Sequence, residues 1–246
     1  MIWALFLLLG VLQATDCEAL TLSELLTRTR VYLKDTSTTR QRFSDSQLTN
    51  LLNDAVQDAN LRTFAVVGTT QFALISGTTE YSLPTDNIAV LRVTLNHVPT
   101  PERTFSFFDD RGDDWVVRST GTVEGYYIRT SSSLVAGVLR ESIGFFPRSA
   151  TGGAQVDYLA QPATLANSGD VPFGSDNKRL YPFHHILAYR AAYMGYLTLG
   201  DLDTAVTFYK NYEMQIPTME AASKTRLSYN PNFRGNISFA PAPTGQ

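Results

Sequence analysis

The stretch RFSDSQLTNLLNDAVQDA, residues 42–59, carries a complete helix signature, and the fold builds outward from it. Ser44 and Gln47 have the spacing of a capping box, in which each side chain accepts a hydrogen bond from the other residue's backbone N–H group. A phenylalanine before the cap and a leucine after it stand where a hydrophobic staple requires them. Apolar residues then recur at helical spacing, with polar residues on the opposite face. The stretch therefore predicts an amphipathic helix over about residues 43–64.

Upstream, a second capping box indicates another helix. Thr21 and Glu24 have the same spacing, and apolar residues follow at helical intervals as far as Leu33. The polar segment 35–42 separates the two helices. A short connection of this kind favours an antiparallel helical hairpin.

Downstream, the hydrophobic period changes from 3.6 to 2 near Gly68, which predicts strands. Residues 71–74 and 80–83 flank a Ser-Gly-Thr-Thr turn, a pattern that indicates a β-hairpin. Residues 89–95 alternate in the manner of a half-buried strand, and an Asn-His turn follows them. Three further strand candidates, separated by turns rich in glycine and serine, lie at residues 126–128, 142–146 and 154–159.

The helical period returns near the C-terminal end. An apolar stripe over residues 186–197 follows Pro182, which suits a first helical turn, and Gly200 suits the helix end. Asp201 is placed to cap a further helix, which Pro217 is expected to kink or interrupt. The remaining residues include basic side chains, prolines and spaced aromatics but no acid. Such a stretch cannot form its own core and indicates an extended arm.

Together these patterns predict an α+β fold. It consists of a helical bundle with two N-terminal and two C-terminal helices, an inserted small antiparallel β domain of about five to seven strands, and an extended C-terminal arm. The expected boundaries are an apolar N-terminal segment at residues 1–20, the bundle at 21–68 and 176–224, the β domain at 69–175 and the arm at 225–246.

Composition narrows the classes of function. The 246 residues include 14 Phe and 12 Tyr, which supply ample apolar area for a packed core. The formal net charge of −3 argues against a protein whose whole surface binds nucleic acid. The single cysteine excludes an intrachain disulfide framework and every multi-cysteine metal site.

The chain starts with an apolar segment, MIWALFLLLGVL at residues 1–12. As a helix it would be too short to cross a bilayer, and it lacks the basic residues of a secretory signal. Three interpretations stay open: an unprocessed segment that packs against protein, a signal for export, and a misassigned start codon.

The strongest catalytic candidate is an acidic cluster, because paired carboxylates can serve glycoside hydrolysis or hold a hard cation. The cluster lacks the spacing of a calcium loop, and a solvated turn explains it more simply. A carbohydrate-active hydrolase nevertheless remains one alternative function. The cluster comprises Asp109, Asp110, Asp113 and Asp114.

Other candidate chemistry is weaker. His184 and His185 are adjacent, and because adjacent helical residues point about 100° apart, the two do not easily share one metal ion. The third histidine, His97, is distant, so we expect one of the pair to lie in the bundle and the other to face out. Cys17 has acidic flanking residues, which disfavour a reactive thiolate. No nucleophile-elbow, zinc-protease or P-loop motif occurs. We therefore predict that the protein is not an enzyme and uses no metal or cofactor.

Aromatic residues favour binding to other proteins. Eight of them crowd the two C-terminal helices, and one bundle face cannot bury them all, so any surplus suits a subunit interface. The arm carries further aromatics that can dock by strand addition or by insertion into pockets. The eight residues are Tyr181, Phe183, Tyr189, Tyr193, Tyr196, Phe208, Tyr209 and Tyr212.

The ordered set of these pieces resembles the head-to-tail adaptor (connector) family of tailed bacteriophages. The opening helical hairpin is one such piece, and TTEYSLPTDNIAVLRVTLN at 78–96 resembles the strand, Leu-Pro, strand passage of that family. GYYIRTSSS at 125–133 and SIGFFPRSATGGAQVDYLAQPATL at 142–165 resemble its middle sheet. LYPFHHILAYRAAYMGYLTLGDLDTAVTFYKNYE at 180–213 resembles its closing helices. The apolar N-terminal segment departs from the family.

The resemblance implies a structural protein of the virion neck. It implies a twelve-fold ring of the protein's own copies that docks on the portal protein and joins it to tail or nozzle proteins. Double-stranded DNA would pass through the lumen without sequence-specific contact, and no membrane would be bound. The expected partner-binding residues lie in the arm: Arg226, Tyr229, Phe233, Arg234 and Phe239. The other alternative is an exported or periplasmic binding protein with an N-terminal signal segment.

Overall fold

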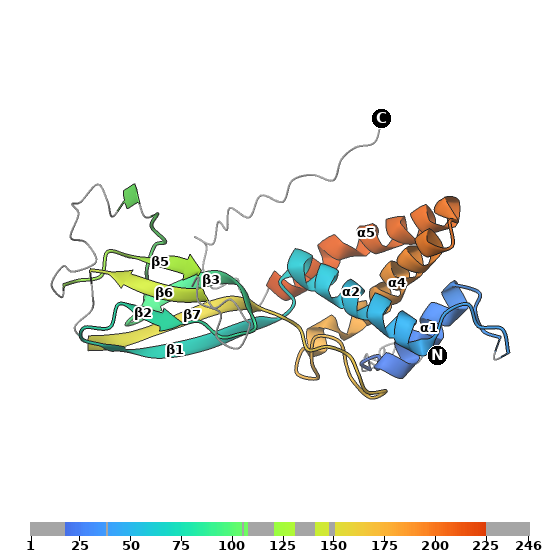
Figure 1. Ribbon diagram of the computed structural model, residues 1–246, viewed down its shortest axis with the longest axis horizontal. Helices are drawn as coiled ribbons and strands as arrows, with labels where there is room; N and C mark the ends of the chain where they lie inside the picture. Colours follow the sequence, from blue (N-terminus) through green and yellow to red (C-terminus); the bar gives the residue numbers. More distant parts are fainter. Residues whose placement is uncertain are drawn as a thin grey trace, which may run out of the picture. The chain divides into compact units, whose positions relative to one another are not determined.

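The computed structural model describes residues 18–37, 39–104, 106–107, 121–130, 141–147 and 151–224 (Figure 1). Within these ranges the chain divides into two compact units. Residues 18–63 and 162–223 form a helical unit, and residues 64–161 form a β unit. The described residues combine long helices with two antiparallel sheets, which confirms the predicted α+β class. The predicted C-terminal arm and apolar N-terminal segment lie outside these residues, apart from residues 18–20.

Both predicted capping boxes are present in the helical unit. Thr21 donates its backbone N–H to Oε2 of Glu24 at 2.8 Å. Ser44 donates its backbone N–H to Oε1 of Gln47 at 2.8 Å, and Gln47 donates in return to Oγ of Ser44 at 3.2 Å. The elements of the unit are α1 (Leu22–Tyr32), α2 (Asp45–Thr63), the 3₁₀ turn η1 (Lys178–Phe183), α4 (His184–Thr198) and α5 (Leu202–Lys224).

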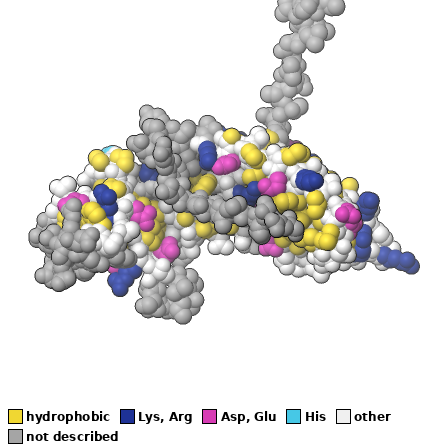
Figure 2. Space-filling model, turned by 90° about the horizontal axis from the view of Figure 1, so that it is seen from above, with side chains coloured by type: hydrophobic (Ala, Val, Ile, Leu, Met, Phe, Trp, Pro, Cys, Tyr) yellow, Lys and Arg dark blue, Asp and Glu magenta, His cyan; other side chains and the backbone are white. Residues whose placement is uncertain are grey.

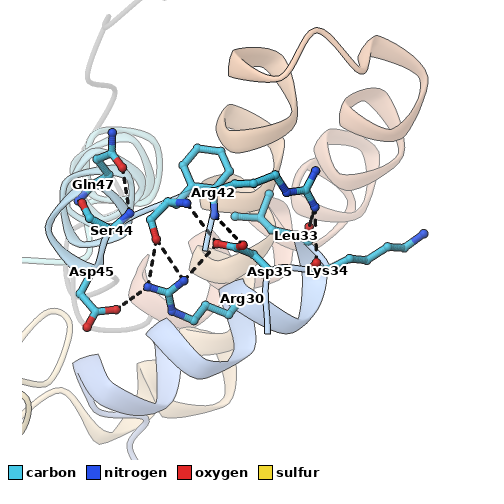
Figure 3. Close-up of polar contacts among 9 residues, drawn as sticks. Arg30, Leu33, Lys34, Asp35, Arg42, Ser44, Asp45 and Gln47 are labelled. Carbon is cyan, nitrogen blue, oxygen red and sulfur yellow. Dashed lines mark hydrogen bonds and ion pairs between the residues drawn. The ribbon is translucent and has the colours of Figure 1, made fainter. Parts of the chain in front are cut away.

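The connection between α1 and α2 is organised around a buried carboxylate, Asp35 (Figure 3). Asp35 accepts hydrogen bonds from the backbone N–H groups of Arg42 at 2.8 Å and Phe43 at 3.1 Å. It also pairs with Arg30 at 3.1 Å, and Arg30 reaches Asp45 in the first turn of α2 at 2.5 Å. Because charge and hydrogen bonds are both satisfied, these contacts of Asp35 tie the end of α1 to the start of α2.

All four α-helices contribute to the core of the helical unit. Phe43 and Leu48, the expected staple, are both buried in one cluster with Leu33, which directly follows α1. Tyr196 of α4 and Ala205 of α5 complete the same cluster. The apolar stripes that predicted the helices therefore meet in one place.

The segment after the β unit packs with the helices. Leu22 donates its backbone N–H to the carbonyl of Asp170 at 2.8 Å. The Asn53 amide group bonds both backbone groups of Leu165, at 2.8 and 3.1 Å. The division between the units therefore falls at residues 63/64 and 161/162, whereas the sequence-based boundaries were 68/69 and 175/176. Residues 162–175 have no strand pattern of their own, and their backbone is held by α1 and α2.

The turn between α4 and α5 follows the predicted chemistry, but the interruption expected in α5 is wrong. Gly200 has a φ of 77°, and Asp201 donates its backbone N–H to the Tyr196 carbonyl at 3.0 Å, which closes the helix end. Asp201 then accepts from the backbone N–H of Thr204 at 3.1 Å. Helix α5 continues through Pro217 to its end. Proline removes only one helix hydrogen bond, and the buried Ile216 and Met219 keep this part of α5 packed.

The β unit consists of two antiparallel sheets with a shared apolar core. One sheet has the order β1-β7-β3-β4 and the other the order β2-β6-β5. Leu74, Val93 and Val156 of the first sheet pack with Ile143 and Phe145 of the second. The strands are β1 (Val67–Ile75), β2 (Glu80–Ser82), β3 (Asn87–Leu95), β4 (Val98–Pro99), β5 (Gly125–Thr130), β6 (Glu141–Phe146) and β7 (Thr151–Ala160).

The expected hairpin between residues 71–74 and 80–83 is wrong. Strand β1 pairs with β7 and β2 pairs with β6, so the intervening turn leads from one sheet to the other. The rings of Phe72 and Tyr81 pack 5.6 Å apart in the core between the sheets. A tight hairpin does join β3 to β4, where Asn96 and His97 adopt φ values of 48° and 69°.

Candidate assembly surfaces

Several residues singled out from the sequence lie outside the described residues. These include all five expected partner-binding residues of the arm, Arg226, Tyr229, Phe233, Arg234 and Phe239. They also include Cys17 and the acidic cluster of Asp109, Asp110, Asp113 and Asp114.

The three histidines lie in three different settings. His184 is fully buried between the rings of Phe173 and Tyr181, and burial lowers its pKa to about 4. His185 contacts the Pro182 carbonyl through Nδ1 at 2.7 Å. His97 lies in the other unit, in the β3–β4 turn. Within the described ranges, no group of three or more His, Cys, Asp and Glu side chains is arranged to hold a metal ion.

A cluster of charges in the helical unit joins α2 to α5 and α4. Arg62 of α2 donates two hydrogen bonds to the carboxylate of Glu213, both at 2.6 Å. Asp58 accepts from the buried hydroxyl of Tyr212 at 2.6 Å and lies 3.5 Å from Arg190. The Arg62 hydrogen bonds hold the pKa of Glu213 below its usual value, while burial raises the pKa of Tyr212. Because each carboxylate faces an arginine, this cluster stabilises the packing of the helices.

The aromatic residues of α4 and α5 divide between core and surface. Tyr212 and Tyr196 are buried. Tyr189 and Phe208 are half-buried and contact each other and Tyr32 of α1, with ring centroids 5.1 to 6.2 Å apart. The part of each half-buried ring that stays in solvent is the surplus that the sequence indicated.

The end of the helical unit at the α4–α5 turn exposes aliphatic side chains. Leu202 is 63% exposed, and Leu197, Leu199 and Val206 are each at least 39% exposed. We call these four residues the α4–α5 patch. Figure 2 shows hydrophobic side chains on the surface of the helical unit, interspersed with charged ones. The helical periodicity predicted that Leu197 faces inward, but the structure exposes it. Periodicity gives no information on where a neighbouring helix ends.

A second candidate surface is the open edge of the first sheet. Strand β1 pairs with β7 along all nine residues, without a bulge. Its other edge has no strand partner among the described residues. The sequence pattern did not indicate this edge, because it predicted that β2 pairs with β1.

Comparison with known proteins identifies the family. The family model described as SU10 adaptor protein matches residues 20–235, which include both units and part of the arm. No curated protein matches the chain at a significant level. In the portion that the structure describes, no helix has the length and apolar character needed to cross a membrane. The chain therefore belongs to the SU10 adaptor protein family and is a structural adaptor protein of a bacteriophage.

Proposed function

We propose that the protein forms the ring that joins the portal of the phage to its tail, at the neck of the virion. The family match over residues 20–235 is the observation that carries this proposal. An adaptor acts by binding, so we infer that the protein catalyses no reaction. The four helices would close into one bundle that the β domain interrupts, since residues from all four share a core.

Two dissimilar exposed surfaces support a ring. The α4–α5 patch belongs to the helical unit and is aliphatic, whereas the β1 edge belongs to the β unit and offers backbone hydrogen bonds. A head-to-tail contact uses two different surfaces of each copy, and such contacts close into rings when the rotation between copies permits. The twelve-fold number follows from the resemblance to head-to-tail adaptors.

The charge balance is compatible with passage of DNA. Each copy has a net charge of −3, so twelve copies carry about −36. An acidic ring repels the phosphate backbone and does not retain the genome through counterion release. The expected contact with double-stranded DNA is therefore transient and independent of sequence.

The arm supplies the expected contacts with the portal or a neighbouring copy. Its basic and aromatic residues are Arg226, Tyr229, Phe233, Arg234 and Phe239. Aromatic and arginine side chains are the anchors that dominate binding energy at protein interfaces. We expect a chain truncated after Thr225 to fold and to fail to mount on portal rings in a pull-down experiment.

A matched pair of full-length variants refines this test. One replaces Tyr229, Phe233 and Phe239 by alanine, and its control replaces the interleaved polar residues Ser228, Asn232 and Ser238 by alanine. The aromatic variant should lose portal binding, and the control should keep it. Normal mounting by the truncated chain and by the aromatic variant would contradict the assigned role of the arm.

A further inference from the structure

The free edge of β1 presents a regular row of unpaired backbone groups. Ala160 donates its backbone N–H to the Val66 carbonyl, which fixes the alternation of the ladder between β1 and β7. The backbone N–H and carbonyl groups of the even-numbered residues of β1 therefore bond with β7, and those of the odd-numbered residues point away from β7. Ile75 uses its outward N–H to bond the Tyr81 hydroxyl at 2.8 Å. The outward groups of Val67, Thr69, Gln71 and Ala73 have no partner in the described part of the chain.

This edge lacks the features by which proteins normally protect edge strands. The sequence of β1, VGTTQFALI, contains no lysine, no other charged residue and no proline. Its pairing with β7 has no bulge, and Ile75 at its end is 61% exposed. A long, uncharged and regular edge is a template for pairing with another strand. In the proposed ring every copy presents this edge, and a strand from another chain would cover it.

The two faces of β1 define the side chains that an added strand must carry. On the inner face, Phe72 is only partly buried against the core, together with Tyr81 of β2. On the outer face, Thr69 bonds the Asp157 carboxylate at 2.9 Å, and Gln71 is exposed. An added strand must therefore place apolar side chains over the inner row and polar side chains beside the outer row.

One stretch of this sequence has the required alternation. In residues 232–239, NFRGNISF, the odd positions are Phe233, Gly235, Ile237 and Phe239, and the even positions are all polar. Pro231 and Pro241 bound the stretch, and proline tends to delimit strands. The bounded stretch has about the length of β1. Seven residues, 225–231, separate it from the end of α5 and span up to about 24 Å when extended.

We propose that residues 232–239 of one copy add as a strand to the β1 edge of the neighbouring copy. This inference rests on the proposed ring, in which each copy donates one arm and accepts another. The outward N–H and carbonyl groups of β1 supply affinity, and the alternation of side chains fixes which face of the arm meets the core. The apolar row Phe233, Ile237 and Phe239 extends the inner face, and the polar row extends the outer face.

A proline substitution tests the edge without disturbing the sheet. Gln71→Pro removes one outward N–H and leaves the hydrogen bonds between β1 and β7 in place, because proline is tolerated where the N–H faces away from the ladder. Gln71→Ala keeps the N–H and is the matched control. Ring assembly by Gln71→Pro should weaken about tenfold, and assembly by Gln71→Ala should be unchanged. Normal assembly by a folded Gln71→Pro variant would overturn the proposal.

Disulfide trapping between two chains tests the occupant directly and does not depend on the proline variant. In a Cys17→Ser background, one tagged chain carries Gln71→Cys and a second, differently tagged chain carries Asn236→Cys or Ser238→Cys. Oxidation of mixed rings should link the two tags for at least one arm position, since paired strands bring Cα atoms within disulfide range. Absence of this link at both positions would overturn the proposal. So would a second design, with both cysteines on one chain, that yields only links within that chain. If the link is absent but rings still form on the portal, only the strand proposal fails and the proposed function survives. If the wild-type protein never forms rings, the proposed function itself fails.

Discussion

At the scale of single residues, His184 shows how burial sets the chemistry of a side chain. It lies at the start of α4 between the rings of Phe173 and Tyr181. Neither ring nitrogen forms a hydrogen bond of normal geometry with the described residues. Burial disfavours the charged imidazolium and lowers the pKa of His184 from 6.5 to about 4, against a smaller opposite effect of the Leu20 backbone. The sequence argued against a metal ligand here, and the structure places the residue in the core.

We predict that acidification between pH 6.5 and about 4 destabilises the protein through His184. The unfolded chain binds a proton at this histidine below pH 6.5, while the folded chain does not until about pH 4. The free energy of unfolding therefore decreases as the pH decreases from 6.5 to about 4, by up to about 3 kcal/mol for this residue. Urea unfolding at a series of pH values measures the slope. His184→Gln should flatten it and His185→Gln should not; equal slopes for His184→Gln and wild type would refute the assignment.

At the scale of elements, local patterns predicted what depends on neighbours along the chain. The capping boxes at Thr21 and Ser44, the Asn-His turn and the end of α4 at Gly200 each need only a few consecutive residues, and each was predicted. The pairing of β1 with β7 joins residues more than 75 positions apart, and periodicity contains no information about such partners. The β1 edge was missed for this reason.

We predict that Ser44→Ala weakens the start of α2. The substitution removes the oxygen that accepts the Gln47 backbone N–H at 3.2 Å and leaves that donor without its cap. Loss of a serine cap costs about 1 kcal/mol of stability. Ser46→Ala, two residues further along and also exposed, is the control and should change the stability little. Thermal or urea unfolding compares the two variants, and equal stability for both would show that the cap contributes nothing.

At the scale of the whole molecule, the proposed function depends on surfaces that a single chain leaves uncovered. The aliphatic α4–α5 patch exposes apolar area to water, and the unprotected β1 edge is a template for pairing with another strand; the proposed ring would cover both. The surplus aromatics and the basic arm predicted from sequence that the protein binds other proteins. They did not predict where the fold exposes the binding surfaces.

We predict that charges in the α4–α5 patch block assembly without unfolding the chain. Leu202→Asp combined with Val206→Asp places two carboxylates where apolar contact is expected, and both residues are exposed, so the fold should tolerate them. Thr218→Asp, also exposed on α5, is the control. Light scattering and portal pull-down should show the double variant as a folded monomer and the control as a ring. Ring formation by the double variant would remove the patch from the interface.

Copies of this chain are proposed to form a ring between portal and tail, and an image of the intact virion tests this most directly. Electron cryo-microscopy of the neck should show a closed ring of this chain seated on the portal, with the β1 edge of each copy covered by its neighbour. A virion neck without this chain, or with a single copy that touches no other, would contradict the account.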